Sequence, residues 1–401
     1  MKYLRKGKSP LTAALRCVLS PLRGVPRNAP VLLPALTFLF IAILLALPTG
    51  FEGAYQFKDA VKCKVEILEV NNSSLIDTGL IRTGQQVCRV KFLNGSFKGQ
   101  TSEGWNMLSG ALSQDKLFRS GDKAQAIVHH DGEEIISVNL IDYYRLDGEL
   151  ILAVTFALFL IIFARGVGFR SVLSFVVSIL VLWKILVPLF LKGFNPIFTG
   201  LVTVAIMTFI ILVLVYGFDK KLLASFCGAM SGILFAMILS TICSRAFHIH
   251  GAVMHNSEAL LYSGFADLNL TQIFMASVCI GASGSVMDLS VDITSAVSEV
   301  VRNCPTISKK EAIKSGLTVA RAAMGTMTTT LLLAYSGTCI AMLMTFMAQG
   351  TPIYNILNNN VVASEIINTI AGSFGLAMTA PLTAVIAGTV LTEKKAHFTK
   401  S

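Results

Sequence analysis

Hydrophobic residues in this chain fall into long uninterrupted runs that are separated by short polar connectors. Several of the runs exceed the roughly 18 residues that mark a membrane-spanning helix. The pattern therefore predicts an α-helical polytopic membrane protein with about eight transmembrane helices. The predicted helices cover residues 31–47, 149–164, 168–190, 194–217, 221–244, 270–297, 317–348 and 361–391.

Residues 51–148 follow a different pattern. Apolar and polar residues alternate from Val61 to Ile67 and again from Cys88 to Phe92, which is the period of a half-buried strand. Asn94-Gly95 and Asp131-Gly132 are turn dipeptides that join strands into hairpins. About five short strands in roughly 100 residues predict a small all-β domain, either a sandwich or a barrel of OB-like type.

The net charge of +10 does not predict nucleic-acid binding, because the basic residues gather in residues 1–30 and in the short connectors. This distribution follows the positive-inside rule and suits contact with a lipid bilayer. We therefore expect a cytoplasmic basic tail and membrane anchor at 1–50, an extracytoplasmic β domain at 51–148 and a seven-helix membrane domain at 149–401, with both termini cytoplasmic. A cleaved signal peptide is the competing interpretation of the first region, although no A-x-A site follows its apolar run.

Cysteine and histidine positions give only weak metal signals. None of the eight cysteines forms a C-x-x-C pair, so a zinc or redox site is not expected. Cys63 and Cys88 both lie on apolar strand faces, which fits either a disulfide in an oxidising compartment or two separate core thiols. His248, His250 and His255 share one predicted outer loop, which is either a divalent-metal site or a solvated polar loop.

A polar stripe lies along the predicted helix 270–297 and its extension. On a helix with 3.6 residues per turn, Gly281, Asp288, Asp292, Ser295 and Glu299 share one narrow face. A charge at membrane depth is costly, so the two aspartates are expected to face protein or water. They lie one turn apart on a single helix, whereas aspartyl proteases pair aspartates from two helices. Because no phosphate-binding glycine loop or HExxH motif is present either, we expect neither an enzyme nor a cofactor.

The next predicted helix carries Arg321, which enters the membrane from the same side as Asp292. We therefore expect an ion pair between Arg321 and Asp292 or Asp288. Such a pair either fixes the register of the two helices or acts as a gate that breaks and re-forms.

Small and polar residues cluster near the middle of the last three predicted helices, at 281–285, 325–330 and 371–375. Close helix packing and discontinuous helices that line a substrate site both explain such clusters. The predicted substrate or ion path consists of Gly281, Gly284, Ser285, Asp288, Asp292, Glu299, Arg321, Gly325, Thr328, Thr329, Tyr335, Glu365, Gly372 and Ser373.

These segments resemble the bacterial YibE/F-like membrane proteins, over roughly residues 50–391. The residues that carry the resemblance include 281–288, 314–316, Arg321, 325–327, 334–335, Glu365 and 371–375. Thr329 departs from it, since family members typically have asparagine there. The resemblance implies a bacterial inner-membrane location and an E-type member with an extracytoplasmic domain. It also implies a homo-oligomer or a heteromer with an F-type partner, but no settled biochemical role.

The polar stripe and the small-residue clusters together predict a membrane transporter or permease subunit with a polar site among the last three helices. Hydroxyl and amide groups with few charges suit a cation or a small polar solute better than a large anion. The alternative is a non-transporting membrane scaffold or envelope-assembly factor that works through its extracytoplasmic domain.

Overall fold

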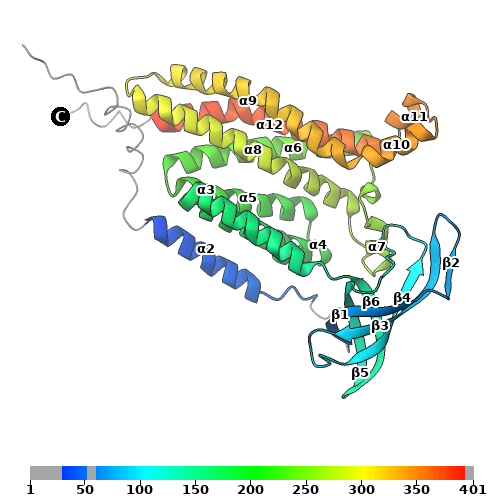
Figure 1. Ribbon diagram of the computed structural model, residues 1–401. Coiled ribbons are helices and arrows are strands. Elements are labelled where there is room, and N and C mark those ends of the chain that lie inside the picture. Colours follow the sequence, from blue (N-terminus) through cyan, green and yellow to red (C-terminus); the bar gives the residue numbers. More distant parts are fainter. Residues whose placement is uncertain (1–28, 52–59, 393–401) are drawn as a thin grey trace, which may run out of the picture. The chain divides into compact units, whose positions relative to one another are not determined.

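The computed structural model describes residues 29–51 and 60–392, and the predicted basic tail at 1–28 and the chain end at 393–401 lie outside the described residues. The chain divides into two compact units (Figure 1). One unit is Gly50–Phe163 and carries the strands. The other consists of Met1–Thr49 together with Ala164–Ser401 and is helical where it is described.

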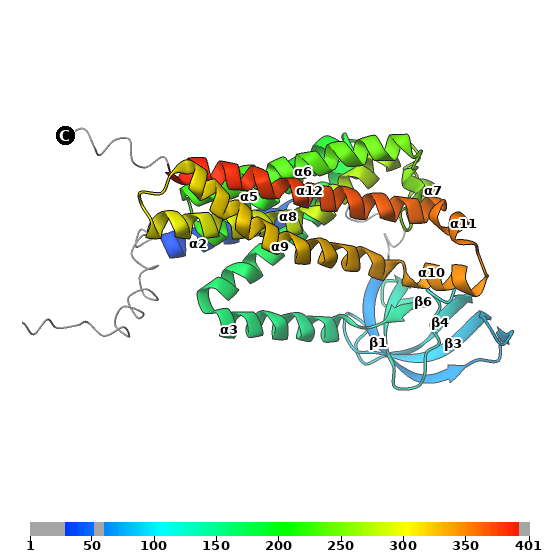
Figure 2. The same ribbon diagram turned by 90° about the horizontal axis from the view of Figure 1, so that it is seen from above.

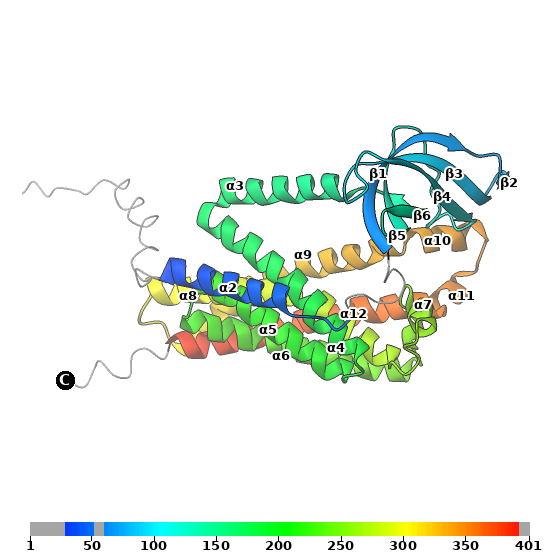
Figure 3. The same ribbon diagram turned by 90° about the horizontal axis from the view of Figure 1, so that it is seen from below.

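The unit Gly50–Phe163 is built on a five-stranded barrel with one short additional strand (Figure 3). The sheet order is β1-β5-β6-β4-β3-β2, and a further pairing of β1 with β3 closes the barrel. Only β4 and β6 pair in parallel, at Trp105 and Asn139. The predicted small β-barrel is therefore confirmed. The strands are β1 (Ala60–Asn71), β2 (Leu75–Asp77), β3 (Arg82–Phe92), β4 (Thr101–Ser109), β5 (Lys123–Asp131) and β6 (Glu134–Tyr143).

The alternating pattern of the sequence fills the barrel with apolar side chains and one buried amide network. Gln86 Nε2 donates to the Phe118 carbonyl at 2.9 Å, and Gln86 Oε1 accepts from the Phe118 N–H at 3.1 Å. Asn106 Nδ2 donates to Gln86 Oε1 at 3.0 Å. These bonds satisfy polar groups that would otherwise destabilise the core. They also fix the segment around Phe118 against β3 and β4.

Cys63 and Cys88 are separate core thiols, which is the second of the two interpretations that the sequence left open. Cys88 pairs with Val70 of β1, which lies seven residues beyond Cys63 on the same strand. That separation is roughly 23 Å of extended chain, whereas a disulfide joins Cα atoms about 4.4–6.8 Å apart. Burial raises the pKa of the Cys88 thiol to about 11, which keeps it protonated at neutral pH.

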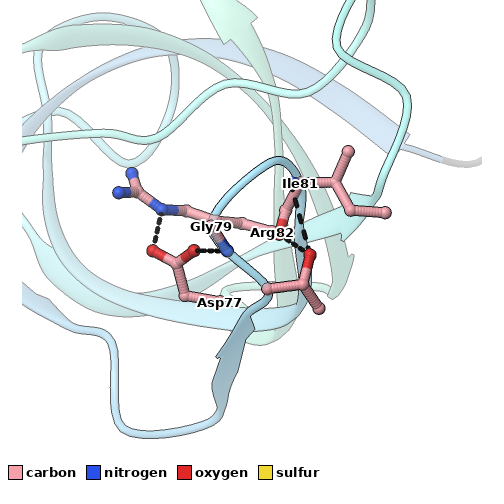
Figure 4. Close-up of polar contacts among 5 residues, drawn as sticks. Asp77, Gly79, Ile81 and Arg82 are labelled. Carbon is pink, nitrogen blue, oxygen red and sulfur yellow. Dashed lines mark hydrogen bonds and ion pairs between the residues drawn. The ribbon is translucent and has the colours of Figure 1, made fainter.

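The β2–β3 hairpin has a tightly bonded tip, shown in Figure 4. The Asp77 carboxylate accepts from Arg82 Nε at 2.7 Å and from the Gly79 N–H at 2.8 Å. The first of these bonds contributes most to holding the pKa of Asp77 below its usual value. Gly79 has φ +83, a conformation that L side chains rarely adopt. The tip is therefore a defined turn that presents Leu80 and Ile81.

The predicted helices 149–164 and 168–190 form one 46-residue helical segment, Leu146–Leu191. The segment is interrupted at Arg165, where φ is 50° and ψ is −124°. Its first part belongs to the barrel unit, and its apolar side chains from Leu150 to Phe163 are largely exposed. A helix that is apolar on all sides is typical of a segment surrounded by lipid.

Within residues 29–51 and 60–392, six helices are long and apolar enough to cross a membrane. They account for seven of the eight predicted spans, because Leu146–Leu191 contains two of them. The predicted anchor is also a helix, but its apolar part, Leu33–Ala46, is shorter than the six. The elements are α2 (Ala29–Ala46), α3 (Leu146–Val181), η3 (Leu182–Leu186), α4 (Val187–Leu191), α5 (Pro196–Tyr216), α6 (Lys220–Ala246), η4 (Gly251–Val253), α7 (Ser257–Tyr262), α8 (Leu270–Asn303), α9 (Lys309–Thr338), α10 (Ile340–Ala348), α11 (Ile353–Leu357) and α12 (Asn360–Thr392).

Helices α5, α6, α8, α9 and α12 run side by side (Figures 1 and 2), with α6, α8 and α12 in mutual contact at the centre. Antiparallel α6 and α12 approach closely because small residues face each other. A Cβ at Gly375 would lie 2.6 Å from the Ala236 Cβ, and one at Gly228 would collide with Thr383. These contacts support the close-packing interpretation of the small residues.

The tight approach of α6 and α12 predicts a large cost for Gly232→Ala. The new Cβ would collide with the Thr379 hydroxyl and lie 2.8 Å from the Gly375 carbonyl oxygen. Overpacking of this kind costs about 1–3 kcal/mol. Gly284→Ala is the matched control, since no atom lies within 4 Å of its added Cβ. Thermal unfolding in detergent should show a lower Tm for the first variant only. Equal Tm values would contradict the packing described.

Candidate functional site

The polar stripe of α8 lies on the one face of that helix that the other helices leave open. Gly281, Gly284, Asp288, Asp292 and Ser295 are all exposed, whereas the intervening apolar residues are buried except Val291, which is half-buried. The buried side packs on α6, where the Cys279 and Met237 sulfur atoms lie 3.5 Å apart. It also packs on α12, where a Cβ at Gly372 would lie 3.3 Å from the Ala282 Cβ.

Two tyrosines flank the stripe. Tyr216, the last residue of α5, donates to the Val291 carbonyl at 2.8 Å and shares a 2.8 Å hydrogen bond with the Ser295 hydroxyl. Tyr335 of α9 covers the other end, where a Cβ at Gly281 would lie 2.5 Å from its hydroxyl oxygen. Position 281 therefore has to be glycine for Tyr335 to sit as it does.

The contact with Tyr216 also sets the depth of the two aspartates. Tyr216 is followed by the polar connector that leads to Asp219, the N-cap of α6. Asp292 lies near Tyr216, so it is level with the end of α5. Asp288 lies one turn, about 6 Å, further along the axis toward the middle of the bundle. Asp288 is therefore the more deeply placed of the two carboxylates.

Arg321 does not pair with Asp288 or Asp292, so the predicted ion pair is wrong: no such pair occurs within residues 29–51 and 60–392. Gly316 packs on Val297 and Tyr335 packs on Gly281, and interpolation between these contacts places Arg321 level with Asp292. The predicted level of Arg321 therefore agrees with the packing of α9 on α8, but the ion pair does not form. Ala320 is buried, and the next residue points about 100° away from it. The small residues therefore take the contact face and Arg321 is exposed.

The small-residue clusters do not break their helices. The Thr328 and Thr329 hydroxyls donate to the Met324 and Gly325 carbonyls within a continuous α9. Gly325 and Thr329 are exposed, and Thr328 is half-buried. The clusters in α8 and α12 are also helical throughout. Of the two interpretations that the sequence left open, discontinuous helices at these clusters are therefore excluded. α9 instead ends at Thr338 and is followed by a short turn into α10 (Figure 2).

The remaining predicted residues have local roles. Gly372 permits the contact of α12 with Ala282 and Leu331, beside the Tyr335 ring. Ser285 donates to the Ala282 carbonyl at 3.0 Å, and Ser373 is half-buried. Glu299 accepts from Arg302 at 2.7 Å in an exposed pair at the end of α8.

Glu365 lies one turn into α12 and lines a pocket of about 250 Å³ together with Tyr335. It acts electrostatically on the Tyr335 hydroxyl. Glu365, Tyr335, Gly281, Asp288 and Asp292 thus follow one another along the bundle. Of the residues beside this series, sequence reasoning missed Tyr216. The feature of the sequence that could have indicated Tyr216 is its position at the very end of an apolar run.

The histidine loop shows no metal site. His250 caps η4 by accepting the Ala252 N–H at its Nδ1 atom, at 3.3 Å. His248 and His255 are exposed. No group of three histidine, cysteine or acidic side chains that could hold a metal ion occurs among the residues that the structure describes.

The separation of Arg321 from Asp292 predicts that the two residues are energetically independent. In a double-mutant cycle of Asp292→Asn and Arg321→Gln, the effects on the free energy of unfolding should add within about 0.5 kcal/mol. The control cycle, Glu299→Gln with Arg302→Gln, removes a pair in contact. Chemical unfolding of the detergent-solubilised protein measures both. A coupling well above 1 kcal/mol between Asp292 and Arg321 would contradict the arrangement of α8 and α9.

Among the comparisons with known proteins, one matches the helical part of the chain. Neither a curated protein nor a solved structure matches the chain. A family model described as YibE/F-like protein matches residues 152–393, which is more than half of the chain. The match begins after the barrel, whereas the resemblance drawn from the sequence reached back to about residue 50. The chain therefore belongs to the YibE/F-like family.

Proposed function

We propose that this protein is a transporter or permease subunit for a cation. The supporting observation is the series of polar residues along the bundle. It begins at Glu365 near the start of α12 and passes Tyr335 and Gly281. It then follows α8 through Asp288 to Asp292, level with the end of α5. Under the predicted topology this series connects the extracytoplasmic side to the cytoplasm.

The charges along the series favour a cation over an anion. Its three ionisable carboxyl groups are Glu365, Asp288 and Asp292, and Arg321 forms no ion pair with the two aspartates. Carboxylate and hydroxyl oxygens are the groups that replace the hydration shell of a metal cation or accept a proton. A small neutral solute would not need two carboxylates one turn apart.

A second chain is needed to complete this path. The stripe is exposed on α8, and an aspartate facing lipid at the centre of a helix costs about 2.5–3.5 kcal/mol. We infer that another protein surface covers the stripe and encloses a hydrated path. A second copy and an F-type partner both fit this role, in agreement with the assembly that the family resemblance implies.

Tyr335 is placed to act as the gate of the path. Its hydroxyl rests on Gly281, and its ring lies beside Gly372 and lines the Glu365 pocket. A rotation of this single side chain would open or close the connection between Glu365 and Asp288. The two glycines would provide the room in which the ring turns.

Cation flux into proteoliposomes of the full chain tests this proposal. With Na⁺, K⁺, Mg²⁺ and H⁺ offered separately, one cation should enter faster than into empty liposomes. Asp288→Asn and Glu365→Gln should each lower that flux about tenfold. A tenfold decrease corresponds to an activation free energy that is higher by about 1.4 kcal/mol. Glu299→Gln is the control, because Glu299 lies outside the series in an exposed pair. Flux equal in the wild type and Asp288→Asn would contradict the proposal.

A second candidate function is a scaffold or envelope-assembly factor, and the barrel carries the observation that favours it. Leu80 at the hairpin tip is 88% exposed and Leu112 is 78% exposed. Both line a groove of about 250 Å³ whose rim includes Asp77, Arg82 and Lys116. The hairpin lies at the end of the barrel away from α3 (Figure 3). Exposed leucines in a groove that also carries charged side chains are typical of a protein-binding surface.

Photo-crosslinking in cells distinguishes the scaffold. A photoreactive residue at Leu80 should form a discrete crosslinked band, whereas the same residue at Ile136 should not. Ile136 is also an exposed apolar position of the barrel but does not line the groove. Leu80→Ser should then abolish the scaffold's partner binding without changing cation flux. No band at Leu80, or bands of equal strength at both positions, would contradict this second candidate.

A further inference from the structure

An apolar pocket lies between the end of α9, the start of α10 and the first turns of α12. Its volume is about 250 Å³, which is enough for a small organic molecule and far more than one water needs. Almost all of its walls are carbon. The residues that matter for its chemistry are Leu332, Tyr335, Cys339, Leu343, Glu365 and Ile366.

The turn between α9 and α10 explains why the pocket exists. α9 ends at Thr338, Cys339 has φ −96° and ψ −1°, and α10 begins at Ile340. The helix therefore does not continue straight along α12 at this point. Tyr335 is held toward Gly281 and Gly372, which leaves the space between Leu332 and Ile366 unfilled. The turn at Cys339 and the position of Tyr335 together therefore leave this groove open.

Glu365 gives the pocket its charge. It is the only charged residue between Arg321 and Glu393, and no lysine, arginine or histidine lines the pocket. It is half-buried and lines the pocket together with Tyr335. An ionised carboxylate in apolar surroundings is stabilised by a positive charge of the ligand. The Tyr335 ring can add a cation–π contact.

We propose that this pocket binds a lipophilic organic monocation. The onium group lies at Glu365, and the apolar body of the ligand fills the space along Leu332, Leu343 and Ile366. The inference stands on the pocket itself, although Glu365 and Tyr335 also belong to the path of the proposed function. Binding here does not require transport. A lipid acyl chain is the other occupant that the walls would accept, and it would not need the carboxylate.

Protection of Cys339 from alkylation tests the proposal, because this thiol lines the pocket. The full chain in detergent is treated with N-ethylmaleimide, and peptide mass spectrometry follows alkylation at Cys339 and at Cys304, an exposed thiol outside the pocket. The probe is benzyltrimethylammonium, and neopentylbenzene is its neutral carbon analogue. At about four times its Kd, the cation would occupy about four fifths of the sites and slow alkylation of Cys339 about fivefold.

We expect the cation to slow alkylation of Cys339 but not of Cys304, the neutral analogue to have no effect, and Glu365→Gln to remove the protection. Equal protection by the cation and its neutral analogue would overturn the proposal in favour of an acyl-chain site. Protection that survives in Glu365→Gln, or no protection at all, would also overturn it. Asp288→Asn, which should lower flux about tenfold, should leave the protection unchanged, so the failure of one proposal is distinguishable from the failure of the other.

Discussion

Close backbone contact among α6, α8, α9 and α12 is the constraint on which the rest of the membrane unit depends. Gly232 and Gly375 bring α6 and α12 together, and Gly316 brings α9 onto both α8 and α12. Lipid tails are as apolar as leucine, so helix association in a bilayer depends on such packing. An interior this tight has no room for a hydrated carboxylate. The aspartates of α8 are therefore placed on its outer face, between α5 and α9.

This arrangement links packing to the proposed function. The same glycines that allow close contact also form the seat of Tyr335, because Gly281 and Gly372 meet its hydroxyl and ring. Tyr335 in turn lies between the Glu365 pocket and the α8 stripe. The placement of charge on an outer face is stable in a membrane only if another protein surface covers it. We therefore propose that transport depends on assembly with a second chain that covers the stripe.

The helices and the barrel could be predicted from sequence because long apolar runs and strict alternation are strong local signals. The stripe was also predictable, since it depends only on helical periodicity. The missing Arg321 pair was not predictable, because the exposure of Arg321 depends on which residues of α9 pack against its neighbours, and these are Gly316 and Ala320. The sequence left a disulfide between Cys63 and Cys88 open for a similar reason. Cys63 and Cys88 share a core, but the strand register holds them apart.

The central claim is that the α8 stripe lines a hydrated path and does not face lipid. Reaction of introduced cysteines with a charged, water-soluble methanethiosulfonate in native membranes tests this most directly. Gly284→Cys lies on the stripe in open space, and Leu333→Cys lies on an exposed face of α9 at a similar depth. The account predicts rapid modification at 284 and none at 333. Resistance at both positions would contradict it.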